Sequence, residues 1–235
     1  MIYLKNYKIF EMAIIKPYEI DSLIDELINQ RPRTQEAANE ISNEYGVDII
    51  THDEFTESIK EDEDMLRDVP PKNGKFLFMP NSGIHFAALN KFTRRINLVV
   101  EYAPFIRFIT GGCPPPLLQI IKSMLGHETI HLQQFRKMGN IVDRYDLEGS
   151  PTTDADKYLS SKTEIMAYAF SIVDELKRFG ASKEEISNIV KSNNTDPKRG
   201  GSWILGWYER EVKDPKVIKR LRKYIYLYLQ ELFEE

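Results

Sequence analysis

Two histidines and a glutamate lie close together in this sequence and have the spacing of a catalytic metal site. His127 and His131 are four residues apart, and Glu128 directly follows the first of them. On a helix, residues at positions i and i+4 share one face at a separation of about 5–6 Å, so both imidazoles can bind one metal ion. The glutamate is then placed to take a proton from a metal-bound water. The pattern predicts a Zn²⁺ site in which Glu128 is the general base of a hydrolase.

The surrounding residues predict a long helix, from Leu117 to about Met138, that turns both histidines inward. Ile120 and Met124 occupy the same i, i+3 and i+4 row as the histidines, and Gly139 ends the helix. An inward imidazole needs a polar partner, and a metal ion provides one. The alternative is a surface helix with two ordinary histidines, which would break this apolar register.

A zinc site for hydrolysis usually has a third protein ligand. Glu164 is the first candidate, because it stands near the start of an otherwise apolar helix predicted from Lys162 to Phe179, and the small Ala167 lies one turn later. A role in helix capping also explains an acidic residue in a first turn, so that alternative stays open. The competing candidates are carboxylates of the polar loop between Asn140 and Lys157. They are Asp143, Asp146, Glu148, Asp154 and Asp156.

With these residues the chain resembles the gluzincins, the HExxH zinc metallopeptidases whose third ligand is a glutamate on a following helix. The resemblance covers residues 125–170 and includes Gln134, which gives the extension HExxHxxQ found in some bacterial and phage members. It implies a zincin-like fold, with His127, His131 and Glu164 as zinc ligands and Glu128 as general base. The compact chain is also similar to phage-encoded peptidases. A peptide or protein is therefore the expected substrate.

The same resemblance implies an antiparallel edge strand ahead of the active helix, on which a peptide substrate can lie. Ile96–Tyr102 is the candidate for this strand. The sequence departs from thermolysin-like peptidases in two ways: the gap from His131 to Glu164 is longer, and no Asn-Glu-x-x-Ser-Asp motif accompanies the glutamate. The substrate specificity is therefore not transferred.

A hydrolytic site also needs a donor for the negative charge that develops on the substrate oxygen. Tyr158 is the first candidate, because it lies on the approach to the helix that carries Glu164. Tyr145, Tyr168 and His85 are the alternatives.

The predicted fold class is α+β, mostly helical, with a small antiparallel sheet ahead of the active-site helix. The expected strands are short runs rich in β-branched and aromatic residues: Lys75–Met79, Ile96–Tyr102 and Phe105–Ile109. Further helices are expected at five places. They are Tyr18–Asn29, a segment from Thr34 to about Tyr45, a short segment beginning near Asp53, a segment opened by Ser182, and a segment from about Pro215 to Phe233.

We predict a single zincin-like domain over residues 1–235. Residues 1–70 form a helical N-terminal part, residues 75–180 hold the sheet with the HExxH and glutamate-bearing helices, and residues 181–235 form C-terminal helices. The 235 residues suffice to bury a core without disulfide or metal support.

Composition limits the function classes. A single cysteine excludes internal disulfides and cysteine-based zinc modules, so any zinc here is held by nitrogen and oxygen. A net charge of −4 argues against binding nucleic acid through bulk positive charge. We find no signal peptide and no membrane span, and expect a cytoplasmic protein, or a virion protein if the gene is phage-borne.

Two other functions are compatible with the same residues. The first is a non-enzymatic structural, virion or interaction protein that retains a zinc site. The second is a zinc hydrolase that acts on a non-peptide amide, such as one in a cell wall.

Overall fold

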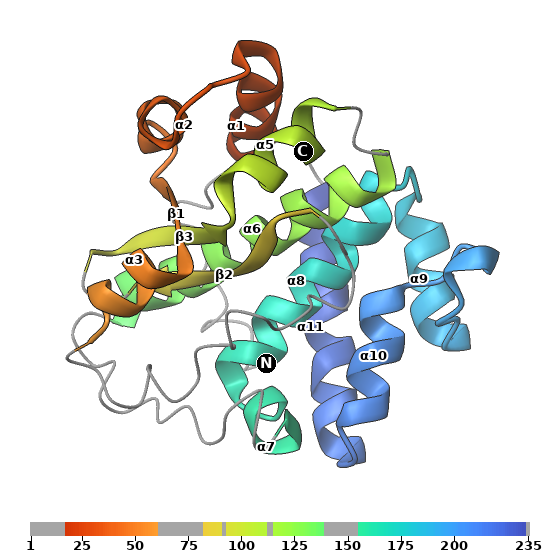
Figure 1. Cartoon of the computed structure of the whole chain (residues 1–235). Coiled ribbons are helices and arrows are strands. Elements are labelled where there is room, and N and C mark those ends of the chain that lie inside the picture. The colour runs from red at the N-terminus through yellow and green to blue at the C-terminus, as the bar shows by residue number, and fades with distance from the viewer. Residues whose placement is uncertain (1–16, 61–81, 91–92, 112–114, 139–154, 234–235) are drawn as a thin grey trace.

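The structure is a computed structural model that describes residues 17–60, 82–90, 93–111, 115–138 and 155–233 (Figure 1). It is mostly helical and has a small sheet. The elements are α1 (Pro17–Gln30), α2 (Gln35–Asn43), β1 (Val47–Ile50), α3 (His52–Ser58), β2 (Ile84–Asn90), β3 (Arg95–Val100), α5 (Tyr102–Thr110), α6 (Pro115–Met138), α7 (Ala155–Leu159), α8 (Lys162–Arg178), α9 (Lys183–Ser192), the short 3₁₀ helix η3 (Pro197–Arg199), α10 (Trp203–Glu211) and α11 (Pro215–Phe233).

The sheet is mixed, so the expectation of a purely antiparallel sheet is wrong. Its strand order is β1-β3-β2, with β1 parallel and β2 antiparallel to the central β3. A parallel pair needs a long crossover connection, and here the chain passes through α3 and β2 between the two parallel strands. The composition of a strand does not reveal the path of that connection.

The three expected strands have different outcomes. Ile96–Tyr102 corresponds to β3, and Lys75–Met79 lies outside the described residues. Phe105–Ile109 is not a strand but part of helix α5. Phe105 and Ile109 are four residues apart and both buried, so the run follows the helical period, which is hard to distinguish from a strand over five residues. Strands β1 and β2 were not predicted.

The long helices lie where the sequence predicts them, and the capping residues expected at their ends form the corresponding hydrogen bonds. The hydroxyl of Thr34 accepts a hydrogen bond from the amide of Ala37 and caps α2. Ser182 and Glu185 form a reciprocal capping box at the start of α9. Helices α7 and α10 were not predicted, and none of the helices in the described ranges is long and apolar enough to cross a membrane.

Helix α6 has residues in two hydrophobic cores, and α8, beside it near the middle of the molecule, belongs to one of them (Figure 1). One core joins α1, α2, α5 and one side of α6 to the sheet, and the other joins α7 to α11 with Ile130 of α6. The two helices run antiparallel, since Gln134 meets Thr163 at one end and Ser123 meets Ser171 nearer the other. A Cβ on Gly126 would lie 3.0 Å from the Phe170 ring, so this glycine permits the close approach.

Candidate metal centre

The structure brings His127, His131 and Glu164 together at the α6–α8 contact. The two histidine Nε2 atoms are 3.1 Å apart. The Glu164 carboxylate places Oε1 3.2 Å from His131 Nε2 and Oε2 3.5 Å from His127 Nε2. One ligand atom from each of the three residues lies within 4.8 Å of the others. The three residues named as ligands from the sequence therefore converge.

The start of α8 explains how Glu164 reaches this position. Ser161 is the N-cap, and its hydroxyl accepts a hydrogen bond from the Glu164 amide at 3.3 Å. The serine thus performs the side-chain capping that was the alternative explanation for Glu164. The Glu164 carboxylate, only 2% exposed, instead faces the two histidines.

The hydrogen bonds of His131 leave its Nε2 without a proton in the neutral ring. The Thr163 carbonyl can only accept, so the side-chain amide of Gln134 donates its N–H to it, at 3.1 Å. This orientation turns Gln134 Oε1 to His131 Nδ1 at 3.1 Å, and Nδ1 must donate. The neutral His131 ring then has its lone pair on Nε2, towards the cluster.

His127 follows the same logic with a serine. The Ser171 hydroxyl donates its proton to the Ala167 carbonyl at 3.0 Å. His127 Nδ1, at 3.1 Å from Ser171 Oγ, is then the donor in their contact. Its Nε2 lone pair also points into the cluster, so both imidazoles present a nitrogen in the state that binds a metal.

The donor set fits a cation. Glu164 Oε2 is buried and has no hydrogen-bond partner, which is uncommon for a buried carboxylate oxygen. Two imidazole nitrogens and a carboxylate are ligands that Zn²⁺ accepts in hydrolytic sites. With both imidazoles neutral, three acceptors converge without a donor among them, and a positive charge, from a metal ion or from a proton on His131, stabilises this arrangement.

The pKa values reflect the same charge balance. Burial opposes the charged form of His131, but the neighbouring Glu164 carboxylate outweighs it and raises the pKa of this imidazole to about 9. Burial alone would raise the pKa of Glu164, but the two histidines hold it well below its ordinary range. The cluster therefore favours an ionised carboxylate together with a positive charge.

Glu128 lies between the metal ligands and the sheet. Its carboxylate accepts a hydrogen bond from the Leu89 amide of β2 at 3.0 Å. Burial raises the pKa of this carboxyl, although the two histidines and the Leu89 amide act in the opposite direction. The residue named as general base is thus beside the ligands, and a backbone amide positions it.

The strand at the site is β2, so the candidate Ile96–Tyr102 is wrong for this role. β3 is the central strand of the sheet, and β2 is the edge strand that contacts Glu128. Strand β3 contains three β-branched residues, Ile96, Val99 and Val100, which made it the most visible strand in the sequence. β2, Ile84–Asn90, has one β-branched residue and two alanines, which are depleted in strands, and gave a weaker signal.

Two of the candidate oxyanion donors lie at the site. Burial and the Glu164 carboxylate raise the pKa of Tyr158 well above its ordinary value, so its phenol stays protonated. The Tyr168 ring packs edge-on against His127, with ring centroids 4.5 Å apart. His85 lies instead beside the ring of His52, at 6.2 Å between centroids, and Tyr145 lies outside the described residues.

The competing carboxylates are not part of this cluster within the described residues. Asp156 accepts a hydrogen bond from the Lys213 amide at 3.0 Å and fastens α7 to the segment between α10 and α11. The other competitors belong to a segment outside the described part of the chain. They are Asp143, Asp146, Glu148 and Asp154.

Sequence reasoning missed Ser171 and Leu89. Ser171 carries a usable signal, because it follows Glu164 by seven residues, or two helical turns, and so lies on the same helix face. Leu89 acts through its backbone amide, and no residue type signals that role.

Comparisons with known proteins add no identification. A scan against models of protein families finds no model that matches the chain, and searches of curated proteins and of solved structures find no match either. The resemblance to gluzincins therefore rests on the residues of the site.

Proposed function

We propose that the protein is a zinc-dependent hydrolase, and specifically a metallopeptidase of the gluzincin type with a zincin-like fold. The observation that carries this proposal is the placement of Glu128 beside the cluster of His127, His131 and Glu164. A metal-binding trio alone is compatible with a structural site. The adjacent carboxylate, held by the sheet and not by a cation, is what a hydrolytic site requires.

His127, His131 and Glu164 would hold the metal. Structural zinc sites usually have four protein ligands, whereas catalytic sites have three and leave one position open. Bound zinc supplies a Lewis acid that lowers the pKa of water and polarises a carbonyl group. The ligand count among the described residues supports the catalytic type.

Glu128 acts as the general base. Its carboxylate takes the proton from the attacking water and passes it to the leaving nitrogen of the amide. Its raised pKa suits both steps, because the group accepts a proton more readily than an ordinary exposed glutamate. The Leu89 amide keeps this carboxylate on the side of the ligands that faces β2.

The remaining groups suit a peptide substrate. The edge strand β2 offers backbone groups on which an extended peptide can add as a further strand. Tyr158, protonated and beside Glu164, is the proposed donor to the oxygen of the tetrahedral intermediate. In this proposal β2 binds the peptide, Glu128 is the general base and Tyr158 donates to the oxyanion.

The test combines metal analysis with cleavage of a peptide library read by mass spectrometry. We expect about one zinc per wild-type chain. The Glu128→Gln variant should keep that zinc and lose cleavage by at least about 100-fold, because general bases contribute 10²–10⁴-fold. Glu175→Gln, a buried glutamate on α8 away from the cluster, is the matched control and should cleave like the wild type.

Each contrary result has a distinct meaning. Purified wild-type protein that binds no zinc overturns the proposal altogether. Stoichiometric zinc without cleavage of any peptide overturns the peptidase assignment and favours a structural zinc site or a non-peptide amide as substrate. Equal cleavage by wild type and Glu128→Gln overturns the role of Glu128.

A further inference from the structure

We propose that Gln134 is a positioning residue that locks His131 in its metal-binding state and ties it to the helix that carries Glu164. The inference rests on the proposed zinc site and extends it to a residue that does not touch the metal. Gln134 is 5% exposed, and both polar atoms of its amide are used.

The amide of Gln134 is a bridge between the two helices. Its nitrogen donates to the carbonyl of Thr163, the residue directly before Glu164 in the chain. Its oxygen accepts from His131 Nδ1. One side chain therefore connects a ligand on α6 with the backbone next to the ligand on α8, so the two ligands are held as a unit.

The bridge also has only one working orientation. A flipped amide would place its oxygen against the Thr163 carbonyl oxygen, which leaves two acceptors in contact and the carbonyl without its donor. The Thr163 carbonyl thus fixes the orientation of the amide. The amide in turn fixes the proton on Nδ1 and leaves Nε2 free to bind.

Ser171 supports His127 in a different way. Its hydroxyl accepts from His127 across the two helices, but it donates one turn back along its own helix, to Ala167. The partners of the two histidine Nδ1 atoms, Gln134 and Ser171, are thus neutral side chains. In many zinc sites the corresponding partner is a carboxylate or a backbone carbonyl. Gln134 instead reaches across from α6 to the α8 backbone directly before Glu164, so its loss should affect both the ring of His131 and the position of the first turn of α8.

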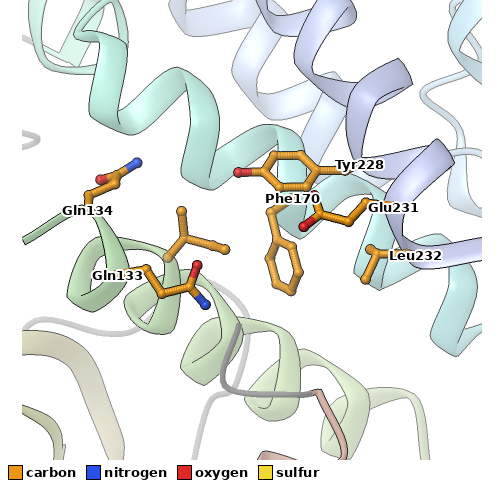
Figure 2. A pocket seen from close by; sticks show the side chains of 7 residues that line it. Gln133, Gln134, Phe170, Tyr228, Glu231 and Leu232 are labelled. Carbon is orange, nitrogen blue, oxygen red and sulfur yellow. The ribbon is translucent and has the colours of Figure 1, made fainter. Parts of the chain in front are cut away.

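The neighbouring Gln133 provides a matched control. Gln133 and Gln134 lie on the same turn of α6 and border one small pocket, which Phe170 and Tyr228 also line (Figure 2). Gln133 is 7% exposed, and its side-chain nitrogen has no hydrogen-bond partner. Replacing either glutamine by methionine removes an amide of the same size from the same helix turn, but only the change at Gln134 removes a histidine partner.

The experiment compares Gln134→Met with Gln133→Met by chelator competition for zinc. Loss of an outer partner of a ligating histidine typically costs 10–100-fold in metal affinity, so we expect that loss for Gln134→Met. Gln133→Met should bind zinc within about twofold of the wild type, because it removes an unpartnered donor. In zinc-loaded protein, proton NMR should show a slowly exchanging Nδ1–H for His131 that Gln134→Met loses while that of His127 remains.

The outcomes separate this inference from the zinc site itself. Wild-type protein that binds no zinc means that the proposed function fails. Zinc binding that is equally tight in wild type and Gln134→Met, or an unchanged His131 Nδ1–H signal, overturns the positioning role and leaves the zinc site standing. A fall in thermal stability of the zinc-free Gln134→Met protein with unchanged zinc affinity assigns a purely structural role and also overturns it.

Discussion

The α6–α8 helix pair carries two polar clusters with buried side chains that differ in how their charges are matched. The metal-site cluster consists of His127, His131 and Glu164. The ion-pair cluster lies nearer the other end of the pair and also reaches α1. Its members are Asp21, Asp25, Lys122, Asp174 and Arg178.

In the ion-pair cluster every cation faces carboxylates from the protein itself. Arg178 Nε is 2.7 Å from Asp174 Oδ2, and Arg178 also pairs with Asp21. Lys122 Nζ lies 3.2 Å from Asp25 Oδ1. In the metal-site cluster, by contrast, acceptors face one another. Each cluster has a buried atom without a hydrogen-bond partner, but in the ion-pair cluster it is a donor, Arg178 Nη2, and in the metal-site cluster it is an acceptor, Glu164 Oε2. The comparison teaches that burial and polarity do not identify a ligand site, whereas a surplus of acceptors does.

The largest expected effect is on zinc affinity, when Glu164 of the metal-site cluster is replaced. Glu164→Gln keeps the shape of the side chain but removes its charge. Four-ligand zinc sites have binding free energies of about 10–16 kcal/mol, which is up to about 4 kcal/mol for each ligand. Zinc affinity should therefore fall by about 1,000-fold, or about 4 kcal/mol. Chelator competition measures this. Glu175→Gln on the same helix is the control, and an equal loss in both variants would contradict a ligand role for Glu164.

The next prediction concerns the ion-pair cluster. Asp174→Ala removes one partner of Arg178, whose side chain is only 7% exposed. Removing one member of a buried pair costs 3–5 kcal/mol, and because Asp21 remains we expect about 3 kcal/mol of unfolding free energy. Urea denaturation of zinc-free protein checks the value. Zinc affinity should stay within about threefold, and a much larger change would show that the two clusters are coupled.

A third, smaller effect is a pH dependence beside the ion-pair cluster. Burial raises the pKa of Glu175 to about 7, although the Ser202 hydroxyl and two backbone amides at the start of α10 oppose the shift. The folded protein then holds this proton more tightly than the unfolded chain. The contribution of Glu175 to stability is fully present below pH 4.5 and is lost as the pH rises towards 7.

Denaturation from pH 4.5 to 8 tests this sign. A pKa difference of one unit corresponds to about 1.4 kcal/mol, and the remaining exposure of the carboxyl reduces the effect. Over this interval the unfolding free energy of the wild type should therefore fall by about 2 kcal/mol relative to that of Glu175→Gln. Glu184→Gln, an exposed glutamate of α9, should follow the wild-type curve. A Glu175→Gln curve parallel to wild type would show that the carboxyl is not protonated in the folded protein.

The smallest expected effect lies between the clusters, at the closest approach of the two helices. Alanine at Gly126 is favoured by helix propensity by about 1 kcal/mol. Its Cβ, however, would meet the buried Phe170 ring at 3.0 Å, and overpacking costs about 1–3 kcal/mol. We expect a net loss of about 1 kcal/mol in thermal denaturation. A stabilised Gly126→Ala protein would mean that the ring moves aside freely.

The sequence was most informative where local signals act alone. Capping residues and the helical period placed α1, α2, α6, α8, α9 and α11 close to their observed bounds. Phe105–Ile109 failed because five apolar residues satisfy both periods, and only contact with the core made the run a helix. Strand β2 was missed because Ile84 is its single β-branched residue and two alanines stand in its middle.

What the sequence by itself determined was the spacing of His127 and His131 on one helix face and the position of Glu164 in the first turn of another helix, because the helical period fixes both. Only the tertiary structure decided that these two faces meet, since that depends on the packing of two hydrophobic cores around α6 and α8. It also decided that Leu89 holds Glu128 and that Gln134 and Ser171 orient the imidazoles. Those roles follow from the direction of individual hydrogen bonds, and no pattern along a chain specifies them.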